Sequence, residues 1–512
     1  MRRLFGIETE YGIAVEDRGA SDLMQESIAL IRSFIGDHVT GWNYRGEDPR
    51  RDMRGFTVER LSTNPDDAQF DLPGQPPMST AEERSDRVLS NGARLYNDHG
   101  HPEYSTPECS NLCDLVAHDR AGERIVWACA QRRSEATGKR IWIYKNNTDY
   151  HGASYGTHEC YLMRRDTPPE TLIQALIPFL VTRQLYAGAG KVGIEGERST
   201  EPIYQLSQRA DFFSVEASVD TLHNRPLVNT RDEPHAIPRH YRRLHVIIGD
   251  ANMSEWATAI KVGTTALVIT LIEDGFCPNL KIRNPVQALK QISRDQTLQW
   301  RVELQDGRTM PAIDIQRVYL QEARKRLAGS SPDTDWTLAE WTDILDALES
   351  DILRATDRVD WVAKRRLLEQ FMELEGCHWD DPVMQSLDLA YHDLDPKAGL
   401  YAGLEQAGEM RRIVTEKRID AAITCPPEDT RAFIRGLFVS RFGPAVRSIG
   451  WNGIAFRHQG EDLLFDMNSL VEENVALLNE ELVSASSLED VVAVLQRRPG
   501  EPTPAEEPSN ER

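Results

Sequence analysis

Residues 6–12 read GIETEYG and residues 91–98 read NGARLYND. Polar and apolar residues alternate in both stretches, and each predicts a β-strand, because successive side chains of a strand point to opposite faces. Glu8 and Glu10 therefore share one face of the first strand. Two neighbouring carboxylates repel each other unless a cation lies between them, so this face is either a solvated surface or a cation site.

The second stretch favours the cation site. Arg94, Tyr96 and Asp98 share one of its faces, and Glu103 follows after a short turn. A guanidinium suits phosphate, and oxygen ligands suit Mg²⁺, which often binds substrate phosphates as well. An Arg94–Asp98 surface pair is a poor alternative, because four residues of a strand span about 13 Å. The two strands together predict a site for magnesium and a phosphorylated ligand.

Two histidines extend this prediction. His158 lies in a predicted strand at 154–160, and His245 lies in another at 241–249. Either side chain can serve as a metal ligand or have a structural role in its strand, and both alternatives stay open.

The pattern of the chain predicts an α+β fold with a largely antiparallel sheet and helices on one side. A polar stretch at 37–88, rich in Asp, Arg, Pro and Gly, predicts a long inserted loop. The predicted strands lie at 3–13, 92–98, 140–145, 157–163 and 242–249. The predicted helices run from an N-cap at Thr167 to about Tyr186, from an N-cap at Asn252 to near Gly275, and over much of 284–415.

The same pattern divides the chain into three parts. Residues 1–425 are expected to form a large domain that contains the flexible insertion at about 37–88. Residues 426–498 mix short strands and helices and are expected to form a small C-terminal domain. Residues 499–512 are rich in Pro and Glu and are expected to be disordered.

Composition restricts the possible functions. The net charge of −22 argues against a nucleic-acid binder, which needs a basic surface. We find no export signal and no apolar run long enough to cross a bilayer. The seven cysteines are scattered without a disulfide pattern, which is typical of reduced thiols. The sequence therefore predicts a soluble cytoplasmic protein that binds no nucleic acid and no membrane.

Several long motifs resemble the Pup ligase/depupylase family, where Pup is the prokaryotic ubiquitin-like protein. The resemblance extends from residue 3 to beyond residue 450. It implies a glutamine-synthetase-like large domain, whose curved antiparallel sheet holds ATP and Mg²⁺, followed by a small C-terminal domain. The motifs are GIETEYG (6–12), NGARLYND (91–98), HPEY (101–104), KNN (145–147), NTRDEPH (229–235) and YRRLHVIIGDAN (241–252).

The family has two branches, and the insertion at 37–88 resembles that of the depupylase branch. Its segments at 42–44 (WNY) and 49–56 (PRRDMRGF) carry this likeness. The resemblance implies ATP- and Mg²⁺-dependent hydrolysis of the C-terminal glutamine amide of Pup, and of the isopeptide bond between Pup and lysines of pupylated proteins. Such an activity belongs to the bacterial proteasome pathway. A Pup–protein ligase and a non-catalytic Pup- or nucleotide-binding regulator are the alternatives.

The resemblance also implies roles for individual residues. Asp98 matches the catalytic aspartate, which either attacks the amide itself or activates water as a base. The expected metal ligands are Glu8, Tyr96 and Glu103, with Glu10, His158 and His245 as further candidates. The expected ATP contacts are Arg94, Thr106 and Trp451. Arg231 is expected to meet the terminal residue of Pup.

A cluster of basic residues precedes the strand that carries His245. Arg239, Arg242 and Arg243, together with Arg231, are candidates for a groove that attracts acidic Pup. Strand alternation places Arg242 and Arg243 on opposite faces, so the four cannot all face one groove. The alternative is that they form surface ion pairs with neighbouring acidic residues.

Overall fold

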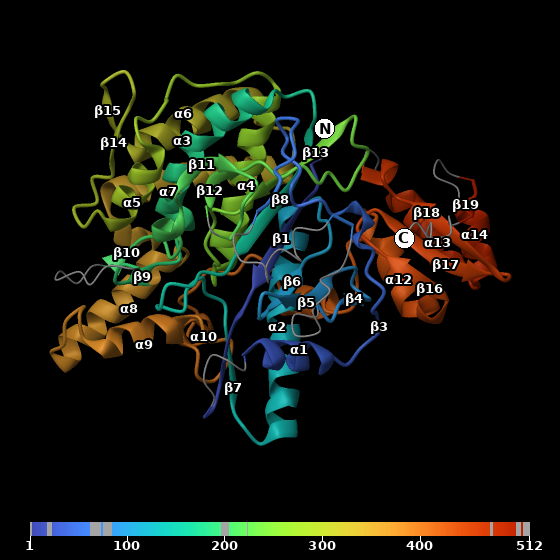
Figure 1. Ribbon diagram of the computed structural model, residues 1–512. Coiled ribbons are helices and arrows are strands. Elements are labelled where there is room, and N and C mark those ends of the chain that lie inside the picture. The colour runs from blue at the N-terminus through green and yellow to red at the C-terminus, as the bar shows by residue number, and fades with distance from the viewer. Residues whose placement is uncertain are drawn as a thin grey trace.

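A seven-stranded antiparallel sheet forms the centre of the molecule (Figure 1). The computed structural model describes residues 3–17, 23–61, 73–74, 84–195, 204–222, 224–471, 475–497 and 503–504. The α+β fold with an antiparallel sheet is confirmed. In spatial order the strands are β13 (Tyr241–Val246), β8 (Thr157–Arg164), β1 (Phe5–Glu10), β6 (His101–Ser105), β5 (Arg94–Asp98), β4 (Arg87–Leu89) and β3 (His38–Val39).

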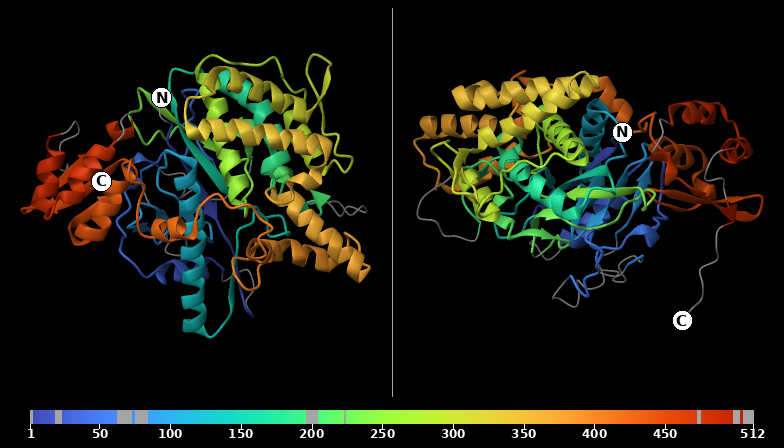
Figure 2. Two further views of the ribbon diagram at one scale, coloured as in Figure 1. Left: turned by 180° about the vertical axis from the view of Figure 1, so that it is seen from behind. Right: turned by 90° about the horizontal axis from the view of Figure 1, so that it is seen from above.

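Helices cover one face of this sheet (Figure 2). Apolar side chains of the central strands, such as Ile7, Tyr161 and Leu244, belong to one buried cluster with residues of the covering helices. The residues that alternate with them point to the opposite face, where the candidate site lies. The covering helices are α2 (Leu112–Thr137), α3 (Pro169–Ala187) and α4 (Glu255–Glu273).

The first predicted strand is divided in two. Within 3–13, β1 ends at Glu10, and β2 (Gly12–Val15) then pairs with β7 (Ile141–Tyr144) in a separate two-stranded sheet. The Tyr11 side chain is fully buried at the junction. The predicted turn after Asp98 is shorter than expected, because β6 begins at His101 and pairs with both β1 and β5.

The predicted N-caps of the two central helices are wrong by one and two residues. Pro168, rather than Thr167, is the N-cap of α3. The hydroxyl of Ser254 accepts from the amide of Ala257 and caps α4. Asn252 instead donates its side-chain amide to Ala187 and Asp360. By length and apolar composition α4 could cross a membrane, but 89% of its apolar window is buried within the protein, as in a core helix.

The region at 284–415 is mainly helical, as predicted, with one hairpin inside it. The hairpin consists of β14 (Arg301–Glu303) and β15 (Thr309–Pro311). The helices are α5 (Pro285–Arg294), α6 (Ala312–Leu327), α7 (Pro332–Ser350), α8 (Asp360–Glu375), α9 (Pro382–Tyr391) and α10 (Leu400–Gln406). The remaining elements before the C-terminal region are α1 (Leu23–Arg32), α11 (Glu416–Ala422), β9 (Lys191–Val192), β10 (Tyr204–Gln205), β11 (Val215–Ser218) and β12 (Pro226–Asn229).

The stretch at 37–88 is more than a loop. Its two ends form β3 and β4 at the edge of the central sheet. Residues 62–72 and 75–83 lie outside the described residues, so the flexibility of the insertion stays a prediction. The predicted disordered tail at 499–512 also lies outside them, except for β19 (Thr503–Pro504), which pairs with β18 (Glu461–Asp466).

The C-terminal elements share a hydrophobic cluster to which Trp42 and Val88 of the N-terminal part contribute. The predicted boundary between residues 425 and 426 stays a prediction. Buried ion pairs join this region to the sheet, because Arg431 and Arg435 both contact Glu108. Besides β18, the elements are α12 (Ala432–Phe442), β16 (Val446–Ile449), β17 (Gly453–His458), α13 (Ala476–Ser484) and α14 (Leu488–Leu495).

Candidate active site

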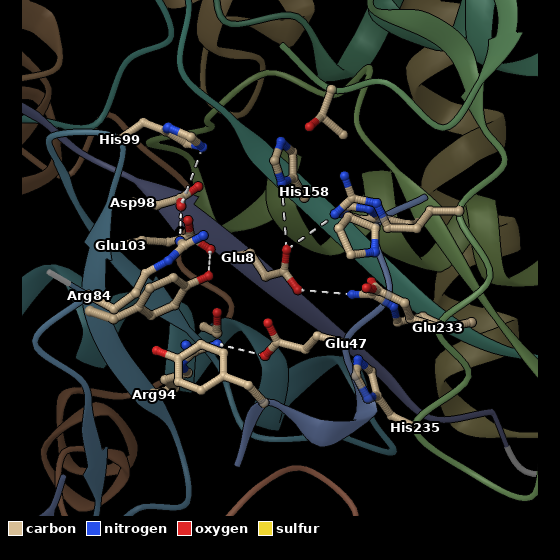
Figure 3. A pocket seen from close by; sticks show the side chains of 18 of the residues that line it. Glu8, Glu47, Arg84, Arg94, Asp98, His99, Glu103, His158, Glu233 and His235 are labelled. Atoms are coloured by element: carbon tan, nitrogen blue, oxygen red, sulfur yellow. Dashed lines mark hydrogen bonds and ion pairs between the residues drawn. The ribbon is translucent and has the colours of Figure 1, made fainter. Parts of the chain in front are cut away.

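A polar cavity of about 170 Å³ lies on the sheet face opposite the helices (Figure 3). Five strands of the central sheet line it, and residues of the 37–88 stretch such as Glu47, of the segments 220–222 and 231–235, and Trp451 from the C-terminal region form the rest of its wall. Figure 3 shows Glu8 in its middle, between Asp98 and Glu103 on one side and Glu233 on the other. The cavity therefore gathers residues that lie far apart in the sequence.

Strand register explains which side chains meet. Glu10 in β1 lies opposite Glu103 in β6, and Glu103 lies opposite Tyr96 in β5. The phenol of Tyr96 donates a hydrogen bond to Glu103. Glu8, two residues before Glu10 on the same face, lies opposite His158 of β8. The side chains of directly opposite residues in an antiparallel pair lie close together. These cross-strand pairs therefore bring the predicted ligands together.

The carboxylates of Glu10, Asp98 and Glu103 form an acidic cluster, with donor oxygens within 4.8 Å of one another, and Asp98 and Glu103 of this cluster line the cavity. Burial, together with the charges of Glu10 and Glu8, raises the pKa of Glu103 well above its usual value. A bound cation would relieve this repulsion. Carboxylate and phenol oxygens are hard donors, so the residues present fit Mg²⁺.

Glu8 lies in a different electrostatic environment. Burial acts to raise its pKa, but the imidazoles of His158 and His245 and the Arg243 guanidinium outweigh it and hold that pKa well below the usual value. The nearest atoms of the three residues lie 3.5, 3.4 and 3.3 Å from its carboxylate oxygens. Glu8 is therefore an ionised carboxylate that can accept a second cation.

Arg94 lies in the cavity wall between two aromatic faces, 4.0 Å from the ring of Trp42 and 3.9 Å from that of Tyr96. It forms an ion pair of 2.7 Å with Asp86 and a longer one of 3.5 Å with Glu47. Because the guanidinium is fixed on both sides, it presents a cation of defined position to the cavity.

A second, mostly apolar cavity of about 90 Å³ adjoins the first, and Thr106 and Trp451 line it. The Thr106 hydroxyl also accepts from the backbone amide of Ile7 at 3.0 Å, which ties it to β1. Trp451 lies edge-on to Trp42, with ring centroids 5.1 Å apart, and Arg435 lies 4.9 Å from its ring centroid. An apolar cleft beside a charged cavity can hold a ligand with a flat ring at one end and phosphates at the other.

Asp98 lines the cavity beside an arginine that the sequence analysis did not identify. Arg84, from the end of the 37–88 stretch, forms an ion pair with Asp98, and its guanidinium lies 5.6 Å from the ring of Tyr96. The imidazole of His99 is 3.9 Å from the same Asp98 carboxylate. Arg84 therefore fixes the orientation of Asp98.

We expect Arg84→Gln to lower kcat by up to about 100-fold with little change in KM, because a misplaced reactive group slows the chemical step more than binding. Arg84→Lys should restore part of the rate, since it keeps the cation. Steady-state kinetics on both variants measures this. Arg45→Gln removes an exposed arginine of the same stretch and serves as control. If Arg84→Gln raised KM by as large a factor as it lowered kcat, a positioning role would be contradicted.

The structure does not bring the four predicted substrate-binding arginines into one groove. Arg242 points to the helical face, where it is buried and donates to the carbonyl of Thr167, so its predicted place in the groove is wrong. Arg239 is exposed and does not line the cavity. Arg243 lines the cavity but pairs with acidic residues there, and Arg231 also lines it. Strand alternation is the cause, because adjacent residues face opposite sides.

Several cavity residues were missed by the sequence analysis. Ser105 and Cys160 follow from strand alternation, since they lie two residues beyond Glu103 and His158. Ser105 was missed because the start of β6 was interpreted as a turn, and Cys160 was missed although its strand was predicted. Glu47 and Arg84 belong to the stretch interpreted as a loop, and no local pattern marks them. Their position depends on contacts with distant strands.

Comparisons with known proteins agree with this geometry. The family model described as "Pup-ligase protein" matches residues 3–455. A depupylase from Acidothermus cellulolyticus is 44% identical over 476 residues, 91% of this chain and 93% of that protein. A Pup deamidase/depupylase from Mycolicibacterium smegmatis is 42% identical over 476 residues, which are again 91% of this chain and 93% of that protein. A Pup–protein ligase from Acidimicrobium ferrooxidans is 38% identical over 473 residues, 90% of this chain and 94% of that protein.

Two solved structures share the fold. The complex between Pup and its ligase PafA has a TM-score of 0.75 and 31% identity, and covers 97% of this chain and 94% of that chain. The Pup ligase PafA in complex with ADP has a TM-score of 0.69 and 36% identity, with 79% and 91% covered. From the match of the family model over most of its length, and from these relatives, the chain belongs to the Pup-ligase protein family.

Proposed function

We propose that this protein hydrolyses side-chain amides at the C-terminus of Pup. It deamidates a terminal glutamine, and it cleaves the isopeptide bond between the terminal glutamate and lysines of pupylated proteins. The observation that carries the proposal is the carboxylate cluster of Glu10, Asp98 and Glu103 on the open sheet face. The higher identity to depupylases than to the ligase supports hydrolysis over ligation.

ATP is the proposed nucleotide. A relative of the same fold is in complex with ADP, and the two adjoining cavities of this chain suit a base and its phosphates. Trp451 and Thr106 line the apolar cleft and would contact the base end. Arg94, fixed by Asp86 and two aromatic rings, would contact phosphate.

Mg²⁺ is the proposed metal. Glu8, Tyr96 and Glu103 would hold it, with Glu10 nearby and with His158 and His245 as the more distant candidates. When bound, the metal supplies positive charge that stabilises negative charge developing on the reacting groups.

Asp98 is the proposed catalytic residue. A glutamine side chain and a lysine–glutamate isopeptide are both amides, so one reaction serves both substrates. Asp98 either attacks the amide carbon or removes a proton from the water that does. The C–N bond breaks, the nitrogen leaves as ammonia or as the lysine amine after gaining a proton, and water supplies the new carboxylate oxygen. Arg84 holds Asp98 in place.

The partners are Pup and pupylated proteins, in the pathway that feeds the bacterial proteasome. Arg231, which lines the cavity, is the proposed contact for the terminal residue of Pup. A cytoplasmic location agrees with the seven cysteines, all of which are free thiols.

The test is a reaction with Pup that ends in glutamine, in the presence of ATP and Mg²⁺, followed by mass spectrometry. Hydrolysis replaces NH₂ by OH and adds about 1 Da to Pup. A second reaction with a purified conjugate should release Pup and unmodified protein. Conjugates that grow from Pup ending in glutamate would indicate the ligase. Binding of Pup without any change in mass would indicate a non-catalytic regulator.

We expect Glu103→Gln to raise the Mg²⁺ concentration needed for half-maximal activity by at least about 10-fold, because one anionic oxygen donor is lost while side-chain volume is kept. A Mg²⁺ titration of the hydrolysis rate measures this. Glu303→Gln, which removes a carboxylate from a surface ion pair, is the matched control. If both variants needed the same Mg²⁺ concentration for half-maximal activity, Glu103 would not be a metal ligand.

A further inference from the structure

The hairpin that joins β5 to β6 places a histidine beside the proposed catalytic residue. β5 ends at Asp98 and β6 begins at His101, so His99 and Gly100 are the two residues of the turn. Both have positive φ angles, 46° for His99 and 91° for Gly100, as a type I′ turn requires. Such turns favour Asn, Asp or Gly at the first position, because most other residues are strained there. The turn alone therefore does not explain why a histidine occupies this position.

A second hairpin of the chain has the same kind of turn. β17 ends at His458 and β18 begins at Glu461, with Gln459 and Gly460 between them. The φ angles of these two residues are 49° and 89°, close to those of the first turn. Gln459 is exposed to solvent, whereas His99 lines the polar cavity. The same backbone geometry thus presents a solvated side chain in one hairpin and an imidazole to the candidate site in the other.

The imidazole of His99 points toward Asp98 (Figure 3). Its Nε2 atom lies 3.9 Å from the Asp98 carboxylate, and the two side chains are 28% and 19% exposed, so water can reach both. Arg84 pairs with the same carboxylate and fixes its position. Catalytic hydrogen bonds are often long in a free enzyme and shorten when the substrate binds. The separation therefore suits the transfer of a proton between the two groups in the complex with substrate.

The imidazole of His99 is neutral near neutral pH, because burial and the Arg84 charge lower the pKa of His99 to about 3. A neutral imidazole can accept a proton, and the imidazolium formed in this place gives that proton away easily. Hydrolysis of an amide needs such a group, since the nitrogen leaves only after it has gained a proton. Arg84 cannot replace it, because a guanidinium does not release its proton.

We propose that His99 is a second catalytic residue, which carries a proton from Asp98 to the leaving nitrogen. Asp98 removes this proton from a water molecule, whose oxygen forms the new bond to the amide carbon. The proton moves from the carboxyl group of Asp98 to a ring nitrogen of His99, and from there to the amide nitrogen as the C–N bond breaks. Ammonia or the lysine amine departs, and both residues return to their starting state. The role of His99 rests on the proposed amide hydrolysis, and it requires Asp98 to act as the base.

His99→Asn is the main test, because asparagine suits the turn but cannot carry the proton. It should lower kcat by at least about 100-fold, for Pup that ends in glutamine and for a purified conjugate. The midpoint of denaturant unfolding should stay the same or rise. Gln459→Asn places asparagine at the same position of the second hairpin and is the matched control, with full activity expected. Undiminished hydrolysis by His99→Asn overturns the proposal.

The nature of the leaving group distinguishes proton transfer from a structural role. An ester between p-nitrophenol and the terminal glutamate side chain of Pup releases a phenolate, which leaves without gaining a proton. After correction for spontaneous hydrolysis, His99→Asn should slow this reaction by less than about 5-fold, whereas Asp98→Asn should slow it strongly. If His99→Asn slows the ester and the amide by the same factor, the imidazole only shapes the site and the proposal is wrong.

Addition of free imidazole provides an independent check. His99→Gly preserves the turn, since glycine adopts positive φ angles without strain, and it opens space beside Asp98. Free imidazole should therefore restore part of the amide hydrolysis in His99→Gly but none in Asp98→Asn. Equal recovery of the two variants would show that imidazole acts somewhere other than the place of His99, and would count against the proposal.

The parent protein shows which of the two proposals fails. If it hydrolyses neither the amide nor the ester, the proposed function is wrong and the role of His99 fails with it. If it hydrolyses the amide and His99→Asn does so at the same rate, the proposed function stands and only the role of His99 fails.

Discussion

Asp98→Asn is expected to reduce the rate of amide hydrolysis by about 100- to 10,000-fold, the range attributed to a single acid–base group. The amide keeps the volume of the carboxylate but can neither remove a proton nor attack a carbonyl carbon. Asp98 lines the polar cavity but not the apolar cleft, so nucleotide affinity should change little. The rate is measured by following the change in the mass of Pup over time by mass spectrometry. Nucleotide affinity is measured by calorimetry in the presence of Mg²⁺.

Asp306→Asn, in an exposed ion pair with Arg308, controls for a general effect of removing a carboxylate. Substantial hydrolysis by Asp98→Asn would refute the assignment. Loss of nucleotide binding together with activity would instead place Asp98 among the metal ligands, next to Glu10 and Glu103, whose oxygens it adjoins.

Glu108→Ala is expected to reduce the free energy of unfolding by about 3–5 kcal/mol, the cost of removing one partner from a buried ion pair. Arg435 is fully buried and Arg431 nearly so, and both pair with this carboxylate. Arg435 also donates to the carbonyl of Trp451 at 3.2 Å, so weaker nucleotide binding should accompany the loss. Denaturant unfolding followed by tryptophan fluorescence measures the first effect. Asp462→Asn removes an exposed pair with Arg457 and should leave the free energy of unfolding almost unchanged, because solvent screens such pairs.

The same carboxylate predicts a dependence on pH. Burial acts to raise its pKa, but Arg435 and Arg431 outweigh it and lower the pKa of Glu108 to about 2, from 4.5 in an unfolded chain. A lowered pKa stabilises the fold above pH 4.5, and this stabilisation is lost as the pH falls from 4.5 towards 2. The difference in stability between the parent protein and Glu108→Gln should therefore shrink over that interval. A constant difference would contradict the role of the charge.

The central strands of the sheet could be predicted from the sequence, because the alternation of polar and apolar residues that marks a strand is a local pattern. Alternation along GIETEYG places Glu8 and Glu10 on one face, and the structure has them there, opposite Ser105 and Glu103. The break at Tyr11 was missed, because a strand that changes its partner keeps the same alternation on both sides. The N-cap of α4 was misplaced since Asn252 and Ser254 are both good caps, and only the bonds of Asn252 to distant residues distinguish them.

The remaining parts of the site depend on contacts between distant segments. Arg84 and Glu47 line the cavity but belong to a stretch whose composition is typical of a loop. Trp451 also lines it but belongs to the C-terminal region, far away in the sequence. Periodicity reports only which face of an element a residue occupies. It cannot report which other segment covers that face. The basic cluster shows this limit, since Arg242 and Arg243 are adjacent in sequence but lie on opposite faces of the sheet.

The position of β1 has a consequence for biosynthesis. It leaves the ribosome before its partners, which are Ser105 and Glu103 in β6 and His158 in β8, so at about 5–20 residues per second it waits roughly 7–30 s for both neighbours. An unpaired strand is prone to associate with other nascent chains. Glu8 and Glu10 place two negative charges on one of its faces, and charges of this kind act as gatekeepers against such association. The residues proposed to bind the cofactors would thus also keep the nascent chain soluble until its sheet is complete.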